Sequence, residues 1–314
     1  MLSEEALEVG VVLREGIAAA GGVDLLRRAV ADPAQRAVAG DLLDSVGLWD
    51  LDPLSDPLEL EVAAAACQAA GYFALPYPIV ERIGRRDAEA TMLVARTGTR
   101  VAAHADLPLE WSALDLNGDG YRFVGVDDAL SPVMAPFGRV IRVEAGGRAD
   151  PAGAALLSTL QSWWLLGLLE HALADTAQYT REREQFGRAL IKFQGVSFQL
   201  AEMTVEAQAL LELAKYTLWT VADHADSALV DAVALRSAAQ RAAAVVLRGA
   251  HQLHGAMGFT SEVDISWLSR ASQLARRTPE GMHATSGLLT SMIVRDGWPD
   301  LGRADAEGQL AVRR

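Results

Sequence analysis

The sequence has one cysteine and a deficit of positive charge. Cys67 follows the apolar run 63–66 and has no partner for a disulfide within the chain, which predicts a buried, unreactive thiol in a reducing compartment. Lys and Arg number 28 against 41 Asp and Glu, so the formal net charge is −13. A field of this sign repels polyanions. The composition therefore argues against a disulfide scaffold and against nucleic acid or an anionic membrane surface as a partner.

Long apolar runs are also missing. No stretch of about 18 uninterrupted apolar residues occurs, and the first residues lack a basic segment followed by an apolar core. We therefore expect a cytoplasmic protein that is not held in a membrane. Hydrophobic residues still make up 51% of the chain, which is enough to bury a substantial core.

The first half of the chain changes character near residue 87. Residues 1–86 are rich in Ala, Leu and Glu with apolar positions at helical spacing, which predicts an N-terminal helical domain. A helix over about 58–70 is expected to end at Gly71, because glycine accepts the left-handed conformation that follows many helices. Short runs bounded by turn residues predict a reduced β domain over 87–149, with strands near 91–95, 100–103, 121–126 and 139–143. A hairpin turn is expected at 117–120, whose sequence is Asn-Gly-Asp-Gly.

The second half predicts a helical bundle over 150–297, followed by a polar tail over 298–314. Asp150 and Pro151 are a typical helix start, and Asp226 is a further candidate cap. Helices are expected at about 151–184, 195–223, 227–256, 262–277 and 281–295. Long helices with short connections are typical of an antiparallel bundle. The predicted fold class is mainly α with a small β region.

Two segments of the predicted bundle carry the pattern most informative about function. The first runs from Tyr179 through Arg183 to the sequence Gln185-Phe186-Gly187 and is followed by Phe193-Gln194. The second is Gln252-Leu-His-Gly255-Ala256-Met-Gly258-Phe. Together, in this order, they resemble acyl-CoA dehydrogenases, in which Arg, Gln-Phe-Gly and Gln-x-x-Gly-Gly-x-Gly-Phe occupy these places.

The resemblance implies an FAD site that contacts the ADP half of the cofactor. Its implied contacts are Arg183, Gln185, Phe186, Gln252, Gly255, Ala256 and Gly258, with Ala256 standing where the family usually has glycine. The chemistry suits such a site, because a pyrophosphate needs a fixed cation, amide donors and backbone that can approach closely. In the family the flavin of this FAD lies mainly in the neighbouring subunit. No metal is expected, because His251 and His254 have no further ligands near them in the sequence.

The resemblance also shows what this chain lacks. A full family member carries a Thr-Glu-Pro segment with Gly-Ser after it in a larger β domain, where it holds the flavin ring and the thioester; residues 88–148 contain no such segment. Chains shortened in this way resemble the smaller subunits of heterotetrameric acyl-CoA dehydrogenases, some of which act on steroid-derived CoA thioesters. The implied partners are a homologous subunit, an acyl-CoA substrate and an electron-transfer flavoprotein as acceptor.

The catalytic base is open at this point. Glu280, followed by Gly281, lies near the family's base, but it falls one residue late, follows Pro279 and lacks the usual Thr. The base is therefore either Glu280 or a carboxylate of the partner subunit. Two other hypotheses remain, a homo-oligomeric dehydrogenase that uses Glu280 and a structural paralogue that stabilises a partner without catalysis.

Overall fold

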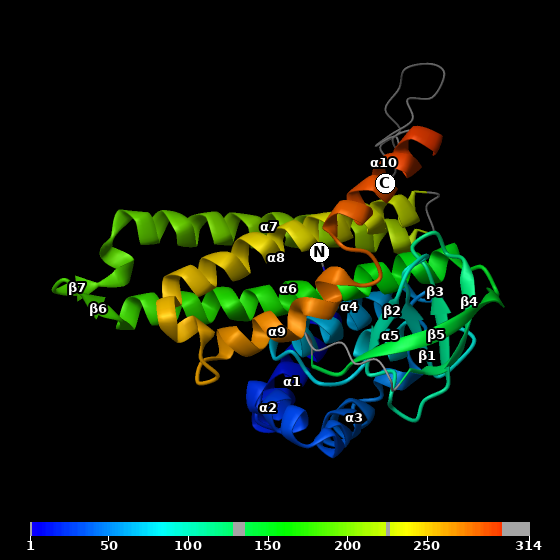
Figure 1. The fold of residues 1–314 in the computed structure, drawn as a ribbon, viewed down its shortest axis with the longest axis horizontal. Helices are drawn as coiled ribbons and strands as arrows, with labels where there is room; N and C mark the ends of the chain where they lie inside the picture. The colour runs from blue at the N-terminus through cyan, green and yellow to red at the C-terminus, as the bar shows by residue number, and fades with distance from the viewer. Residues whose placement is uncertain (1, 128–135, 224–226, 297–314) are drawn as a thin grey trace.

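The computed structural model describes residues 2–127, 136–223 and 227–296, and in these ranges a helical region, a small sheet and a helical bundle follow one another (Figure 1). The helices of the first region are α1 Glu4–Ala19, α2 Val23–Ala31, α3 Arg36–Asp44, α4 Pro57–Tyr72 and α5 Ile79–Ile83. Local chemistry sets their starts: the hydroxyl of Ser3 accepts from Ala6 N–H, and the carboxylate of Asp56 accepts from Leu58 N–H.

The helix predicted over about 58–70 is confirmed within two residues as α4, which continues through Gly71 to Tyr72. Gly71 lies inside α4, where a Cβ would sit 1.8 Å from the carbonyl oxygen of Trp164 in the bundle. The reciprocal position in the bundle is Gly167, where a Cβ would sit 1.9 Å from the carbonyl oxygen of Gln68. These two glycines are needed because their helices approach to backbone contact, and no side chain fits between them.

The β region forms a five-stranded sheet of order β1-β3-β4-β5-β2. Its strands are β1 Ala90–Leu93, β2 Arg100–Ala103, β3 Trp111–Leu114, β4 Gly120–Val126 and β5 Gly138–Gly147. Strands β1 and β3 pair in parallel and the other pairs are antiparallel. The predicted turn at 117–120 joins β3 and β4: Gly118 has φ +84°, and Asp115 Oδ1 accepts from the N–H groups of Asn117 and Asp119. Strand β3 itself was not predicted.

The bundle helices match the predicted ranges within two residues. They are α6 Pro151–Glu182, α7 Gln194–Ala222, α8 Ala228–His254, α9 Asp264–Arg277 and α10 Met282–Asp296. Asp150 caps α6 as predicted, accepting from Gly153 N–H at 2.8 Å, whereas Asp226 and the tail 298–314 lie outside the described residues. Helix α6 is long and apolar enough to cross a membrane, but 83% of that stretch is buried inside the fold.

The core is built where α4, α6 and α8 meet. Trp163 and Cys67 are both fully buried there, and burial raises the pKa of the Cys67 thiol well above its ordinary value. The mainly α fold with a small β region is therefore as predicted. The extent of each region as an independent domain stays a prediction.

Candidate functional site

The two sequence motifs lie at the same end of the helical bundle. Helices α6 and α8 finish there, and α7 and α9 begin there (Figure 1). The ring of Tyr179, in the last turn of α6, stacks on the imidazole of His254 with centroids 4.4 Å apart. His254 Nε2 also lies 3.3 Å from Asp175 Oδ2, one turn before Tyr179 on α6. These contacts fix the end of α8 against the end of α6.

A short hairpin carries the first motif beyond α6. Strands β6 Glu184–Gln185 and β7 Arg188–Ala189 pair, and the two residues between them, Phe186 and Gly187, have φ of +53° and +77°. A side chain in this left-handed region costs about 1–2 kcal/mol relative to the right-handed one. Phe186 is nevertheless 91% exposed, with only an edge contact to Phe193 at 6.2 Å between centroids. An apolar ring displayed in an unfavourable backbone conformation is typical of a surface that meets a ligand or another chain.

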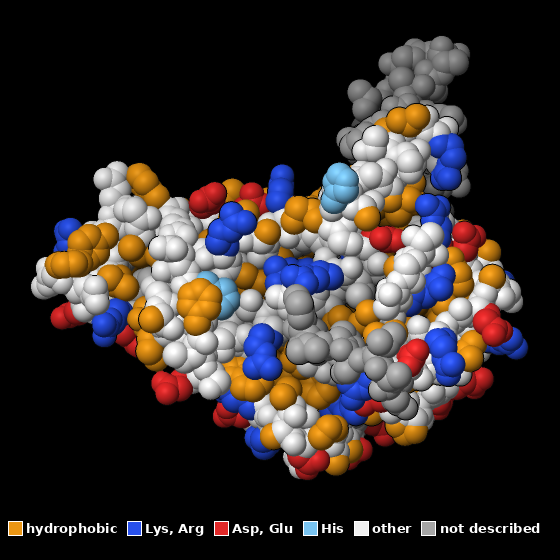
Figure 2. Space-filling view, in the orientation of Figure 1, with side chains coloured by type: hydrophobic (Ala, Val, Ile, Leu, Met, Phe, Trp, Pro, Cys, Tyr) orange, Lys and Arg blue, Asp and Glu red, His pale blue; other side chains and the backbone are white. Residues whose placement is uncertain are grey.

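The polar side chains of the two motifs are exposed and unengaged. Arg183 is the first residue after α6, and its backbone N–H donates to Tyr179 O. Within the described ranges, the side chains of Arg183, Gln185 and Gln252 make no hydrogen bond or ion pair. The guanidinium of Arg188 differs, because it lies 4.0 Å above the ring of Phe193. A cation and two amides are thus available at this end of the bundle, where Figure 2 shows hydrophobic and basic side chains together over the hairpin.

The second motif forms a 3-10 turn over Gly255–Phe259, directly after α8. Gly255 has φ +60° and ψ −137°, a conformation that only glycine adopts readily, and it is exposed. Ala256 beside it is exposed too. Gly258 is different: it is buried, and a Cβ there would lie 3.0 Å from His254 Cβ. Gly255 therefore sets the backbone of an accessible turn, and Gly258 lets that turn pack on α8.

Comparison with known proteins finds a family match within the bundle. Residues 159–285 match the family model described as "Acyl-CoA dehydrogenase, C-terminal domain", a span that includes both motifs. This part of the chain is similar to the C-terminal domain of acyl-CoA dehydrogenases. The short-chain-specific acyl-CoA dehydrogenase of Megasphaera elsdenii is 32% identical over 111 residues, which are 35% of this chain and 29% of that acyl-CoA dehydrogenase. The match thus spans less than a third of its relative.

The acyl-CoA dehydrogenase fold extends over nearly the whole chain. A chain of the ChsE4-ChsE5 complex from Mycobacterium tuberculosis superposes with a TM-score of 0.74 at 18% identity, covering 94% of this chain and 98% of that one. A chain of the Tcur3481-Tcur3483 steroid ACAD variant gives a TM-score of 0.75 at 18% identity, covering 94% and 99%. At this identity the likeness establishes the fold.

Glu280 lies away from the two motifs, in the connection between α9 and α10. Its carbonyl oxygen accepts from Arg236 Nη2 at 3.0 Å and from Gln240 Nε2 at 2.8 Å. Arg236 is 2% exposed, and burial lowers its pKa to about 10, although the charge of Glu280 acts in the opposite direction. Glu280 also borders a groove of about 760 Å³ between α10 and the β region, together with Arg96 and Asp115. The structure therefore anchors the backbone of Glu280 and leaves its side chain at a polar groove.

Sequence reasoning did not foresee how the two motifs are joined. Asp175 and Tyr179 are four residues apart on α6 and both reach His254; Tyr179 begins the first motif, but Asp175 lies outside it. Their i, i+4 spacing places them on one helix face, which is the signal that was available.

Proposed function

We propose that this chain is a subunit of an FAD-dependent acyl-CoA dehydrogenase that introduces an α,β double bond into an acyl-CoA thioester. It would bind the ADP half of FAD across an interface with a homologous partner subunit. The observation that carries the proposal is the unengaged Arg183 guanidinium, displayed between the end of α6 and an exposed aromatic hairpin.

The described residues fit the ADP half of the cofactor. Arg183 supplies a permanent charge with a planar fork of donors that suits a pyrophosphate, and Gln185 and Gln252 supply amide donors. Phe186 offers an apolar face, and Gly255 exposes backbone without a side chain. Ala256 and Gly258 complete the proposed turn, Ala256 at its surface and Gly258 beneath it. FAD, when bound, supplies the acceptor for the hydride that leaves the β carbon.

The proposed partner accounts for what the chain lacks. The sequence has no Thr-Glu-Pro segment to hold a flavin ring, so the partner would hold that ring and the thioester. Two similar structures, titled as a ChsE4-ChsE5 complex and as a Tcur3481-Tcur3483 steroid ACAD, support a two-component enzyme and a steroid-derived acyl group. A further similar chain, with a TM-score of 0.63, comes from a structure titled as an electron transferring flavoprotein, which supports such a protein as acceptor.

Arg183→Ala tests the proposed FAD site. In the complex of this chain with its partner, we expect the variant to lose about 2–4 kcal/mol of FAD affinity, because a pyrophosphate loses its charged fork. Arg183→Lys should retain only part of the FAD affinity that Arg183→Ala loses. Arg181→Ala is the matched control, since Arg181 is an exposed arginine in the last turn of α6 and is not among the proposed FAD contacts.

The measurement is the dissociation constant of FAD by flavin fluorescence, with assembly checked by mass. Equal retention in Arg183→Ala and Arg181→Ala would remove Arg183 from the cofactor site. Stoichiometric flavin in the chain purified alone would instead indicate a homo-oligomeric enzyme. Normal substrate turnover by an Arg183→Ala complex would favour a structural paralogue.

A further inference from the structure

Two histidine–aspartate pairs join the turn between α8 and α9 to helix α6. The turn spans residues 255–263 and carries the glycines of the second motif. At its start, His254 Nε2 lies 3.3 Å from Asp175 Oδ2 on α6. At its end, Asp264 Oδ2 lies 3.5 Å from Nε2 of His171, which is also on α6. The two partners on α6 are four residues apart, so they lie on one face of that helix.

The first ring nitrogen of each histidine fixes one proton. His171 Nδ1 lies 2.6 Å from the backbone oxygen of Tyr72, and His254 Nδ1 lies 2.9 Å from the backbone oxygen of Ala250. A carbonyl oxygen can only accept a hydrogen bond, so Nδ1 is the donor in both contacts. Each histidine therefore carries a proton on Nδ1.

The second ring nitrogen then decides the charge. In a neutral imidazole with its proton on Nδ1, Nε2 has a lone pair and can only accept. Here Nε2 of each ring faces a carboxylate oxygen, which is an acceptor as well. Two facing lone pairs repel each other, whereas a proton on Nε2 makes the same contact a charge-assisted one. The geometry therefore favours the imidazolium form in both rings.

The two carboxylates are suited to hold these protons. The hydrogen bond from His171 lowers the pKa of Asp264, and Arg27 acts in the same direction, although partial burial opposes both. Asp175 Oδ2 is buried, and within the described ranges no other group donates a hydrogen bond to it. A buried carboxylate oxygen without a donor is costly, and a protonated Nε2 of His254 supplies one.

A tyrosine covers each imidazole. Tyr72 stacks on His171 with centroids 4.5 Å apart, and Tyr179 stacks on His254 at 4.4 Å. The electron-rich face of a tyrosine attracts a cation. The imidazoles are only 13% and 1% exposed, and burial disfavours a charge that has no counter-ion, so the paired carboxylates are needed for both rings to stay charged. The two pairs are thus built from the same parts.

We propose that His171 and His254 are held as imidazolium ions and clasp the 255–263 turn to α6 at both of its ends, as positioning residues for that turn. The clasp follows from contacts within this chain alone. Its effect on FAD rests on the proposed function, because the clasp would hold the exposed backbone of Gly255 in a fixed place relative to Arg183.

Imidazole nitrogen NMR of the full chain, labelled with ¹⁵N at histidine, reads the charge of each ring. Both nitrogens of an imidazolium carry protons and have similar shifts, whereas the two shifts of a neutral ring differ widely. Histidine in model peptides ionises near pH 6.5 and is mostly neutral at about pH 7.5. At that pH we expect two protonated nitrogens in His171 and His254, and the neutral pattern in His251, whose pKa is lowered by burial. His171→Gln and His254→Gln assign the signals. A neutral ring at either position would overturn the clasp.

Asparagine at each aspartate separates the two ends of the clasp. Asp175→Asn keeps the size, removes the charge and can donate to a lone pair on Nε2, so His254 should become neutral while His171 stays charged. Asp264→Asn should do the reverse. Asp41→Asn is the control, because Asp41 is an exposed aspartate on α3, and it should leave both rings charged. Two charged rings in all three variants would show that the carboxylates do not hold the protons.

Release of one end should loosen the turn. Amide hydrogen exchange of residues 255–263 in the full chain should be about tenfold faster in Asp175→Asn and in Asp264→Asn than in Asp41→Asn, as the loss of one charge-assisted contact allows. Amides in the middle of α6 are the internal reference and should exchange equally in all variants. An unchanged exchange rate in the turn would overturn the positioning role.

FAD affinity of the complex with the partner subunit separates the clasp from the proposed cofactor site. If Arg183→Ala weakens FAD binding, Asp175→Asn should weaken it too, by about tenfold, because a support behind the site is lost. Unchanged affinity in Asp175→Asn beside a weakened Arg183→Ala complex would overturn the role of the clasp in the FAD site. Full FAD retention in Arg183→Ala would instead overturn the proposed function, and the NMR and exchange results would still decide the clasp.

Discussion

The ring of Tyr179 lies nearly parallel to the imidazole of His254, with an angle of 21° between the planes and 4.4 Å between centroids. The hydroxyl of Tyr179 adds only a long contact of 3.5 Å to His254 O. Arg183 follows Tyr179 by four residues and Gly255 follows His254 directly. The stacked pair therefore sets how the two proposed halves of the FAD site face each other.

Replacement of Tyr179 should weaken FAD binding although Tyr179 is not a proposed contact of the cofactor. We expect Tyr179→Leu to lower FAD affinity of the assembled complex about tenfold, because the ends of α6 and α8 lose their stacking contact. Tyr179→Phe keeps the ring and should bind FAD within about twofold of the unmodified complex. Flavin fluorescence titration measures both. If Tyr179→Leu matches Tyr179→Phe, the pair does not position the site.

Glu280→Gln should leave turnover nearly intact. The glutamate is shifted by one residue from the family's base and its carbonyl is bound by Arg236 and Gln240, so we expect the partner to supply the base. Gln keeps the size and removes the proton acceptor. The measurement is the rate of flavin bleaching by an accepted acyl-CoA at saturation, with flavin content checked first. A loss of about a hundredfold with FAD still bound would make Glu280 the base.

The stability of the chain should carry a pH dependence from Glu81. Burial raises its pKa from the ordinary 4.5 to about 7 in the folded chain, so the unfolded chain ionises first as pH rises. The stabilisation is complete below about pH 4.5, falls as pH rises through 7 and is absent above it. Between pH 5 and 8 we expect the unfolding free energy to fall by about 1–3 kcal/mol more than in Glu81→Gln. Urea denaturation at both values tests this, and parallel changes in the two proteins would refute it.

Gly71→Ala should destabilise the fold strongly. Its Cβ would overlap the backbone oxygen of Trp164 at 1.8 Å, so α4 and α6 would have to separate, at a cost of about 3 kcal/mol or more. Gly16→Ala on α1 is the control, because its Cβ would lie 3.8 Å from Leu42 Cδ1. The free energy of unfolding of this control should rise by about 0.5–1 kcal/mol, because alanine has a higher helix propensity than glycine. A thermal melt distinguishes them; equal melting temperatures would mean that the two helices can move apart.

The long bundle helices could be predicted because each has many turns of apolar periodicity and clear end signals. Asp150 with Pro151 marked one start correctly. Gly71 was expected to follow the helix end because glycine suits that position, but glycine also suits a close contact between helices. Its contact, Trp164, is remote in sequence. Strand β3 was not predicted because its four residues, Trp111–Leu114, show no sustained alternation of polar and apolar side chains and its pairing with β1 is parallel.

The candidate sites also differ in whether the local sequence reveals their residues. The motifs around Arg183 and Gly255 could be read from local sequence, and the structure brings them to one end of the bundle; that they bind FAD stays a prediction. The pairs that His171 and His254 form with aspartates could not be found, because only the packing of α8 and α9 against α6 brings them together.

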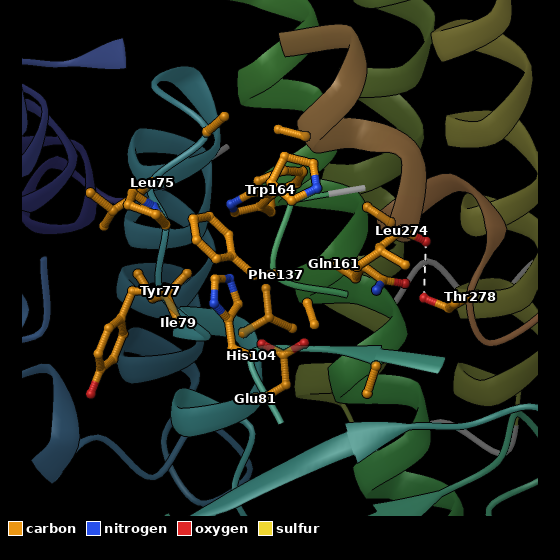
Figure 3. Close-up of a pocket in the computed structure, with 18 of the residues that line it drawn as sticks. Leu75, Tyr77, Ile79, Glu81, His104, Phe137, Gln161, Trp164, Leu274 and Thr278 are labelled. Carbon is orange, nitrogen blue, oxygen red and sulfur yellow. Dashed lines mark hydrogen bonds between the residues drawn. The ribbon is translucent and has the colours of Figure 1, made fainter. Parts of the chain in front are cut away.

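The backbone contact between α4 and α6 also sets the width of the cavity between the α4–α5 connection, β1, β2, α6 and α9 (Figure 3). One wall, Leu75 to Tyr77, follows α4 directly, and the facing wall, Gln161 and Trp164, stands on α6 beside the contact. Because Gly71 and Gly167 leave no freedom for the helices to slide, both walls keep a constant spacing. The width of the cavity is thus fixed by the backbone of two helices and does not depend on the rotamers of its side chains.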